Sequence, residues 1–80
     1  MDIKLLFFGI ARDLIGVSSL EVVLPTNCTV TSFKELLKKQ HPELNQMSVY
    51  AIAINESYAT DETVIKNGDI IAVIPPVSGG

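Results

Sequence analysis

The sequence predicts one small α+β domain, in which about four to five strands form a sheet and one main helix packs on one face. Several short segments alternate between apolar and polar residues, the pattern of half-buried strands. One segment, Thr29 to Gln40, instead has apolar residues at helical spacing. Ile70 to Ile74 is apolar on both faces, which is typical of a central strand covered on each side.

Two strands at the start of the chain are expected to form an antiparallel hairpin. In the first, Ile3 to Gly9, the odd-numbered side chains point to the core and the even-numbered ones point outward, because Lys4 marks the outer face. Gly9 to Gly16 is interpreted as a loop. The second strand spans Leu20 to Leu24 and ends at Pro25. Few residues separate the two strands, which favours direct pairing.

The predicted helix begins after Thr29 as its N-cap and ends at His41 and Pro42. Ser32 and Glu35 form a second possible capping box, so the start is left open by one turn. The apolar residues that share its inner face are Val30, Phe33, Leu36 and Leu37. Lysines occupy the outer face, as expected for an amphipathic helix on a sheet.

Three further strands complete the predicted sheet. The first spans Val49 to Ile54, and a very short one at Tyr58 and Ala59 follows the polar turn Asn55 to Ser57. The last strand, Ile70 to Ile74, follows a turn whose glycine can take a positive φ.

An apolar surface is predicted on the sheet face that the helix leaves open. If Ile71 and Val73 face the helix, three other residues of their strand point the opposite way, in the same direction as Leu6 and Phe8. These three are Ile70, Ala72 and Ile74. One helix covers only one face of so small a sheet, so a partner protein is expected to cover the other. A loop that folds over the patch is the alternative, and the ring of Tyr58 fits either account.

Composition excludes several classes of function. Hydrophobic residues make up 48% and charged residues 19% of the 80, which indicates a soluble globular chain, and no apolar run approaches the ~20 residues that span a bilayer. A net charge of −3 without a basic run argues against nucleic acid and anionic membranes. The first residues lack the features of a secretory signal, so a cytoplasmic location is expected.

No catalytic or metal site is predicted within the domain. Cys28 is the single cysteine, which excludes an internal disulfide and a multi-cysteine metal site, and we interpret it as passive. His41 has no cluster of ligands to join. Asp61 and Glu62 are adjacent in a polar loop and are expected to keep it solvated. No glycine-rich phosphate loop opens a helix, so no bound nucleotide or other cofactor is expected.

The chain is expected to divide into a domain, residues 1–74, and an extended tail, residues 75–80. Pro75 and Pro76 lack the N–H groups that a sheet requires, so the chain should leave the domain there. The tail ends on two glycines and presents the α-carboxylate of Gly80 on a backbone slim enough for a narrow active site in another protein. Six extended residues reach about 20 Å. A frayed chain end is the alternative.

This order of strands and one helix, running into a glycine–glycine end, resembles the ubiquitin-like β-grasp family over the whole chain. Within that family, four segments resemble the small, sulfur-carrying subunits of molybdopterin synthase. They are LLFFG at residues 5–9 with Arg12 following, VTSFKEL at 30–36, NGD at 67–69 and PPVSGG at 75–80. The double proline before Val-Ser-Gly-Gly is the most specific of these, since ubiquitin and thiamine-pathway carriers share a bare glycine–glycine end.

The resemblance implies that the first and last strands lie side by side and parallel at the centre of a mixed sheet. It also implies that an E1-like adenylyltransferase uses ATP to activate the Gly80 carboxylate, which then becomes a thiocarboxylate. The large subunit of molybdopterin synthase would receive the tail, in a heterotetramer of two small and two large chains. Sulfur would pass there to cyclic pyranopterin monophosphate. The catalytic lysines would belong to the large subunit, so this chain is not expected to be an enzyme alone.

The resemblance also implies which residues bind partners. A hydrophobic docking surface is carried over by position to Phe8, Tyr58 and Ile74, of which the last two depart from the family's commoner choices. The tail residues that enter the partner are Pro75, Pro76, Val77, Ser78 and Gly79. Three alternatives stay open: a sulfur carrier for thiamine or tRNA thiolation, a ubiquitin-like modifier that is joined to lysines, and a purely structural interaction module.

Overall fold

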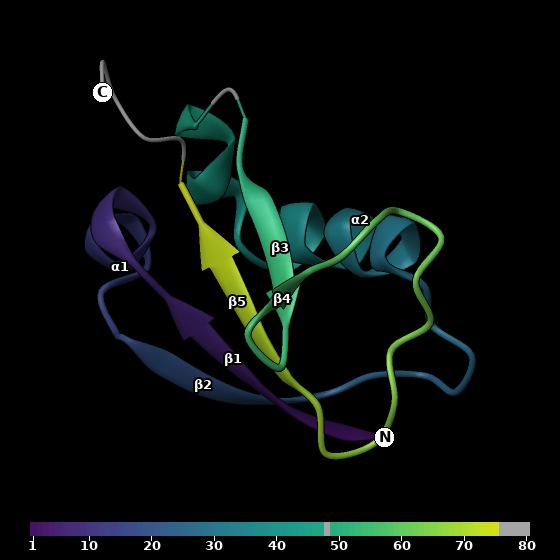
Figure 1. Cartoon of the computed structure of the whole chain (residues 1–80). Coiled ribbons are helices and arrows are strands. Elements are labelled where there is room, and N and C mark those ends of the chain that lie inside the picture. Colours follow the sequence, from purple (N-terminus) through teal and green to yellow (C-terminus); the bar gives the residue numbers. More distant parts are fainter. Residues whose placement is uncertain (48, 76–80) are drawn as a thin grey trace.

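Five strands form one mixed sheet in the order β2-β1-β5-β3-β4 (Figure 1). The computed structural model describes residues 1–47 and 49–75. In chain order the elements are β1 (Asp2–Phe7), α1 (Gly9–Ile15), β2 (Ser19–Val23), α2 (Val30–Gln40), the 3-10 helix η1 (Pro42–Gln46), β3 (Ala51–Ile54), β4 (Ser57–Tyr58) and β5 (Ile70–Ile74). The α+β class and the number of strands are as predicted.

The centre of the sheet is the parallel pair β1 and β5, in register from Lys4 opposite Ile70 to Phe7 opposite Val73. β2 pairs antiparallel with β1, which confirms the expected hairpin. β3 lies antiparallel to β5 on one side and to β4 on the other. Strands from the two ends of the described chain therefore lie side by side in the middle of the molecule.

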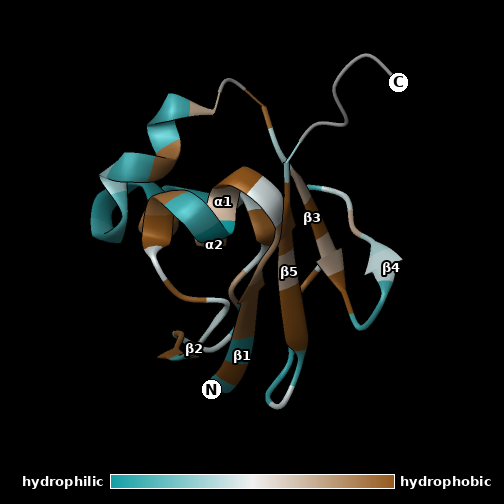
Figure 2. Cartoon of the chain, turned by 90° about the vertical axis from the view of Figure 1, so that its left-hand side faces the viewer, coloured by the Kyte–Doolittle hydropathy of each residue, from teal (hydrophilic) through white to brown (hydrophobic). Residues whose placement is uncertain are grey.

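Helix α2 covers one face of this sheet, and the core lies between them (Figure 2). The buried side chains on the helix are Val30, Phe33 and Leu37, and those on the central strands are Ile3, Leu5, Phe7, Ile71 and Val73. Alternation along each strand places them there, because every second side chain points to the same face. Leu36, expected on the inner face of α2, is only half-buried. Each fully buried large apolar side chain stabilises the fold by about 2 kcal/mol.

The ends of α2 follow the capping chemistry of the sequence. The Thr29 hydroxyl accepts a hydrogen bond from the Ser32 backbone N–H at 3.3 Å, so Thr29 is the N-cap and the second possible start is not used. The backbone N–H of His41 donates to the Leu37 carbonyl at 2.8 Å and closes the helix. Pro42 then begins η1, which the sequence patterns did not predict.

The interpretation of Gly9 to Gly16 as a loop is wrong, because Gly9–Ile15 forms the helix α1. Ala11, Leu14 and Ile15 have helical spacing and pack against the core, while Gly16, at a φ of 92°, forms the C-cap. Two glycines within eight residues suggested a loop, but tertiary burial of the three apolar side chains stabilises this short helix. Strand bounds also shift: β3 begins at Ala51 rather than Val49.

Candidate functional site

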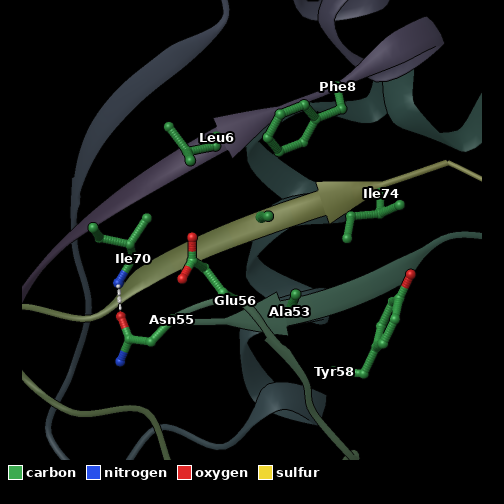
Figure 3. A pocket seen from close by; sticks show the side chains of 9 residues that line it. Leu6, Phe8, Ala53, Asn55, Glu56, Tyr58, Ile70 and Ile74 are labelled. Atoms are coloured by element: carbon green, nitrogen blue, oxygen red, sulfur yellow. Dashed lines mark hydrogen bonds between the residues drawn. The ribbon is translucent and has the colours of Figure 1, made fainter.

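An apolar groove lies on the sheet face opposite α2 (Figure 3). Its volume is about 680 Å³. It is lined by Leu6, Phe8, Ala53, Asn55, Glu56, Tyr58, Ile70, Ala72 and Ile74. Phe8 stays 49% exposed and Ile70 44% exposed, so the loops of the described chain leave this face open. The outward apolar face predicted from alternation is therefore present, and the alternative of a covering loop is wrong for residues 1–47 and 49–75.

One end of the groove brings together the three residues expected to form the docking surface. Phe8 directly follows β1 and its backbone N–H donates to the Val73 carbonyl at 3.4 Å, which ties it to β5. Ile74 is the last residue of β5, and Tyr58 enters from the edge strand β4 with 76% of its surface exposed (Figure 3). The groove thus begins where the chain passes from β5 to Pro75.

The remaining residues of the expected tail lie outside the described residues. These are Pro76, Val77, Ser78, Gly79 and Gly80. Pro75 is described and is half-buried at the end of β5.

The other end of the groove is polar and is closed by the turn between β3 and β4. Asn55 and Glu56 form its two central residues, with φ values of 50° and 72°. Such values define a type I′ turn, which connects tightly paired antiparallel strands. The sequence showed only a polar turn here, and neither residue was predicted to belong to the site.

Hydrogen bonds fix this turn to the start of β5. The Asn55 backbone N–H donates to the Ile70 carbonyl at 2.8 Å, and the Ile70 N–H donates to Asn55 Oδ1 at 3.0 Å. Asn55 Nδ2 donates to Asp69 Oδ1 at 2.9 Å, and the other oxygen of Asp69 accepts from the Lys66 N–H at 2.8 Å. Turn and strand therefore form one rigid unit.

The groove has the chemistry of a binding surface. Its lining is mainly aliphatic and aromatic, with one carboxylate from Glu56 and one phenol from Tyr58. General acid–base catalysis requires a proton-transferring group held against the reacting atoms, usually with a second group that orients it. An apolar wall with a few polar groups at its rim instead suits the docking of another protein.

The residues of reactive type lie away from this groove. Cys28 is 2% exposed, its thiol contacts the Thr29 carbonyl at 3.5 Å, and burial raises its pKa, all of which favour an unreactive thiol. The ring of His41 packs edge-on against Phe7, with centroids 6.3 Å apart. Within the described ranges, His, Cys, Asp and Glu form no group of three that could hold a metal ion.

A β-grasp domain of the ubiquitin-like class is defined by this sheet order, the helix across one face and the open opposite face. The chain belongs to the ThiS family, whose model matches residues 5–80. Among curated proteins, it is 37% identical over 81 residues to the molybdopterin synthase sulfur carrier subunit of Arabidopsis thaliana, covering all of this chain and 84% of that one. It is also 37% identical to the protein of that name from Dictyostelium discoideum, covering 96% and 94% of the two chains.

Solved structures agree with this assignment. A putative molybdopterin converting factor subunit 1 from Pyrococcus furiosus superposes with a TM-score of 0.86 at 29% identity, over 96% of this chain and 99% of that one. A chain from the complex of subunits 1 and 2 of the molybdopterin-converting factor of Helicobacter pylori covers both chains fully, with a TM-score of 0.72 at 28% identity. No helix in the described part of the chain has the length and apolar character that crossing a bilayer requires.

Proposed function

We propose that the chain is a sulfur carrier of molybdenum cofactor biosynthesis and forms the small subunit of molybdopterin synthase. The observation that carries the proposal is the open apolar groove at the base of the Pro75–Gly80 segment, in a chain related over its full length to sulfur carrier subunits. The groove binds the partner, and Gly80 carries the sulfur. The domain, residues 1–74, and the tail, residues 75–80, thus have separate tasks.

The chemistry takes place at the carboxylate of Gly80. One carboxylate oxygen attacks the α-phosphorus of ATP on an E1-like adenylyltransferase, and pyrophosphate leaves. A sulfur nucleophile at the oxidation level of sulfide then attacks the carbonyl carbon, and AMP leaves with the oxygen it bound. The product is a thiocarboxylate. Its sulfur replaces an oxygen substituent on a carbon of cyclic pyranopterin monophosphate, and that oxygen leaves. Water then cleaves the acyl carbon–sulfur bond and restores the carboxylate of Gly80.

The partners follow from this scheme. The adenylyltransferase and the large synthase subunit use the same groove in turn, with Phe8, Tyr58 and Ile74 as anchors, and Pro75 to Gly79 enter the partner's active site. Two small and two large chains form the synthase, which acts in the cytoplasm. The named complex of subunits 1 and 2 from Helicobacter pylori supports a large-subunit partner.

Intact-mass spectrometry tests the proposal. Co-expression with the E1-like enzyme and a sulfur source should add about 16 Da, the replacement of one carboxylate oxygen by sulfur. The thiolated chain should then convert cyclic pyranopterin monophosphate when the large subunit is added. An unchanged mass, under conditions that thiolate a known carrier, would contradict the proposal.

A variant that lacks Gly80 is the matched control. The thermal unfolding of this variant should equal that of the intact chain, because the described core does not involve Gly80. Co-expression with the E1-like enzyme and the sulfur source should leave the mass of the variant unchanged. Diglycine remnants on lysines of other proteins, dependent on this chain, would instead indicate a ubiquitin-like modifier.

A further inference from the structure

The two ends of the groove differ in chemistry, and the difference gives it a direction. Phe8, Tyr58 and Ile74 make the end nearest Pro75 apolar, whereas Glu56 stands at the opposite end, beside Ile70 (Figure 3). Ile70 and Ile74 are four residues apart along β5, which corresponds to about 13 Å in an extended strand. A partner that fills the groove therefore meets the apolar anchors at one end and the Glu56 carboxylate on the side toward Ile70 (Figure 3).

Glu56 occupies this position at a conformational cost. Its φ of 72° lies in the left-handed region, which costs a residue with a side chain about 1–2 kcal/mol relative to its ordinary conformation. Glycine is the preferred second residue of a type I′ turn, because it adopts this φ without strain. A glutamate here contributes nothing to the turn that glycine would not, and what it adds is a carboxylate on the groove.

The backbone that carries Glu56 is fixed, and the carboxylate is unpaired within the described residues. The Asn55 hydrogen bonds to Ile70 and Asp69 fix the turn, and Figure 3 shows the Glu56 side chain reaching from it over β5. Within residues 1–47 and 49–75, its oxygens have no hydrogen-bond or ion-pair partner. A carboxylate on a fixed backbone next to an apolar wall presents a negative charge at a defined place on the groove.

The lysine that lies opposite Ile70 in the neighbouring strand does not serve as the counter-charge of Glu56. Lys4 lies opposite Ile70 in the neighbouring strand, but its side chain lines the two depressions on the far side of β1, shared with Glu21 and with Arg12. Asp69, the other carboxylate near the turn, is already bound to Asn55 and to the Lys66 N–H. Glu56 is thus the carboxylate that the groove presents to a partner.

We propose that Glu56 selects and orients the partner by pairing with a lysine or arginine that flanks the partner's apolar contact with Phe8 and Ile74, on the side toward Ile70. The inference rests on the proposed function, because it takes the groove to be the docking site of the sulfur carrier. The pairing fixes which way round the partner sits, so that its active site faces the end of the groove where Pro75 begins.

Isothermal titration calorimetry of the full-length chain with the molybdopterin synthase large subunit of the same organism tests this pairing. Glu56→Lys should raise Kd about tenfold or more and Glu56→Gln about threefold, and Glu56→Gln should reduce the dependence of Kd on salt. Glu62→Lys makes the same change of net charge in an exposed loop outside the groove and should leave Kd within about twofold of the unchanged chain. One Lys→Glu or Arg→Glu reversal on the large subunit should restore the affinity of Glu56→Lys.

Three results would overturn the inference. Equal Kd values for Glu56→Lys and the unchanged chain, or equal losses for Glu56→Lys and Glu62→Lys, would show that the position of the charge has no effect. A monomer–dimer equilibrium by light scattering that shifts with Glu56→Lys would make a second copy of the chain the occupant. In these cases the unchanged chain still binds and is thiolated, so the proposed function stands. If the unchanged chain neither binds nor is thiolated, the proposed function fails and the inference fails with it.

Discussion

Gly9 lies against Pro75: a Cβ built on Gly9 would be 3.0 Å from Cγ of the proline ring. The first residue of α1 thus contacts the residue at which the chain leaves β5. Gly9 also has a φ of 53°, in the left-handed region that favours glycine. Position 9 is therefore constrained both by its own backbone and by the ring of Pro75.

We expect Gly9→Ala to displace Pro75 and to reduce stability. The left-handed conformation should cost about 1–2 kcal/mol, enough to lower Tm by several degrees in a domain of this size. Binding to the large subunit should weaken more than the loss of stability explains, because the new methyl group shifts the base of the tail. Differential scanning calorimetry and titration calorimetry measure the two effects.

Gly16→Ala is the control for this prediction. Gly16 has a φ of 92°, but a Cβ there would have no neighbour within 4 Å, so the change strains the backbone without touching Pro75. It should lower Tm and leave Kd unchanged. Equal Kd values for both variants would show that the contact between Gly9 and Pro75 has no functional role.

Tyr58→Ala should reduce binding while leaving the fold intact. The ring is 76% exposed at the end of the groove, so its removal should change the free energy of unfolding by less than about 0.5 kcal/mol. Loss of this aromatic anchor should cost about 2 kcal/mol of binding free energy. Val23→Ala, on the edge strand β2 and 75% exposed, should change neither quantity. Loss of binding in both variants would argue against the groove as the docking site.

Asn55→Ala should destabilise the turn that carries Glu56. It removes the hydrogen bonds of the side chain to the Ile70 N–H and to Asp69, and it places alanine at a φ of 50°. The expected loss is about 2 kcal/mol in urea denaturation. Asn55→Gly keeps the positive φ without strain, so it should recover part of this loss. If Asn55→Ala is as stable as the unchanged chain, the hydrogen bonds of Asn55 do not stabilise the turn.

Stability should decrease with alkaline pH through Cys28. Burial raises the pKa of its thiol, so the folded chain keeps the proton at pH values where the unfolded chain has lost it. The contribution is complete below the thiol pKa of the unfolded chain, about 8.5, and is lost as the pH rises above that value, by at most about 1.4 kcal/mol per pH unit. In urea denaturation, the free energy of unfolding of Cys28→Ala should decrease less between about pH 7.5 and pH 9.5 than that of the unchanged chain. Equal slopes of the free energy of unfolding against pH in the two proteins would show that the thiol does not contribute. Burial also raises the pKa of Tyr50, but this phenol titrates at higher pH than the thiol.

Alternation and helical spacing predicted most of the fold because side-chain direction alone decides which residues are buried. Leu5 and Phe7 face α2 while Leu6 and Phe8 face the groove, as their positions in the strand require. The parallel pairing of β1 with β5 came from the family resemblance, since no local pattern encodes which distant strands pair. Helix α1 was missed because its glycines are strong local signals, whereas the burial of Ala11 depends on contacts with the rest of the fold.

The candidate site could be predicted only in part, for a similar reason. Phe8 and Ile74 are large apolar residues at outward positions, so pattern and resemblance both predicted them, whereas Tyr58 was assigned by the resemblance alone. Glu56 has no such signal, because a glutamate in a polar turn is ordinary in sequence. The place of Glu56 in the groove depends on its positive φ and on a turn that is hydrogen-bonded to Ile70, and both follow from tertiary structure.

The central pairing of β1 with β5 also has a consequence for folding. The groove is lined by β1, β5 and the hairpin of β3 and β4, with β5 in the middle, so it is complete only after β5 has joined β1. Pairing between such distant segments is intrinsically slow. A chain still in synthesis, or one whose last strand has detached, therefore lacks the complete groove. A protein that bound this groove would therefore bind the completely folded chain and not an incompletely folded one.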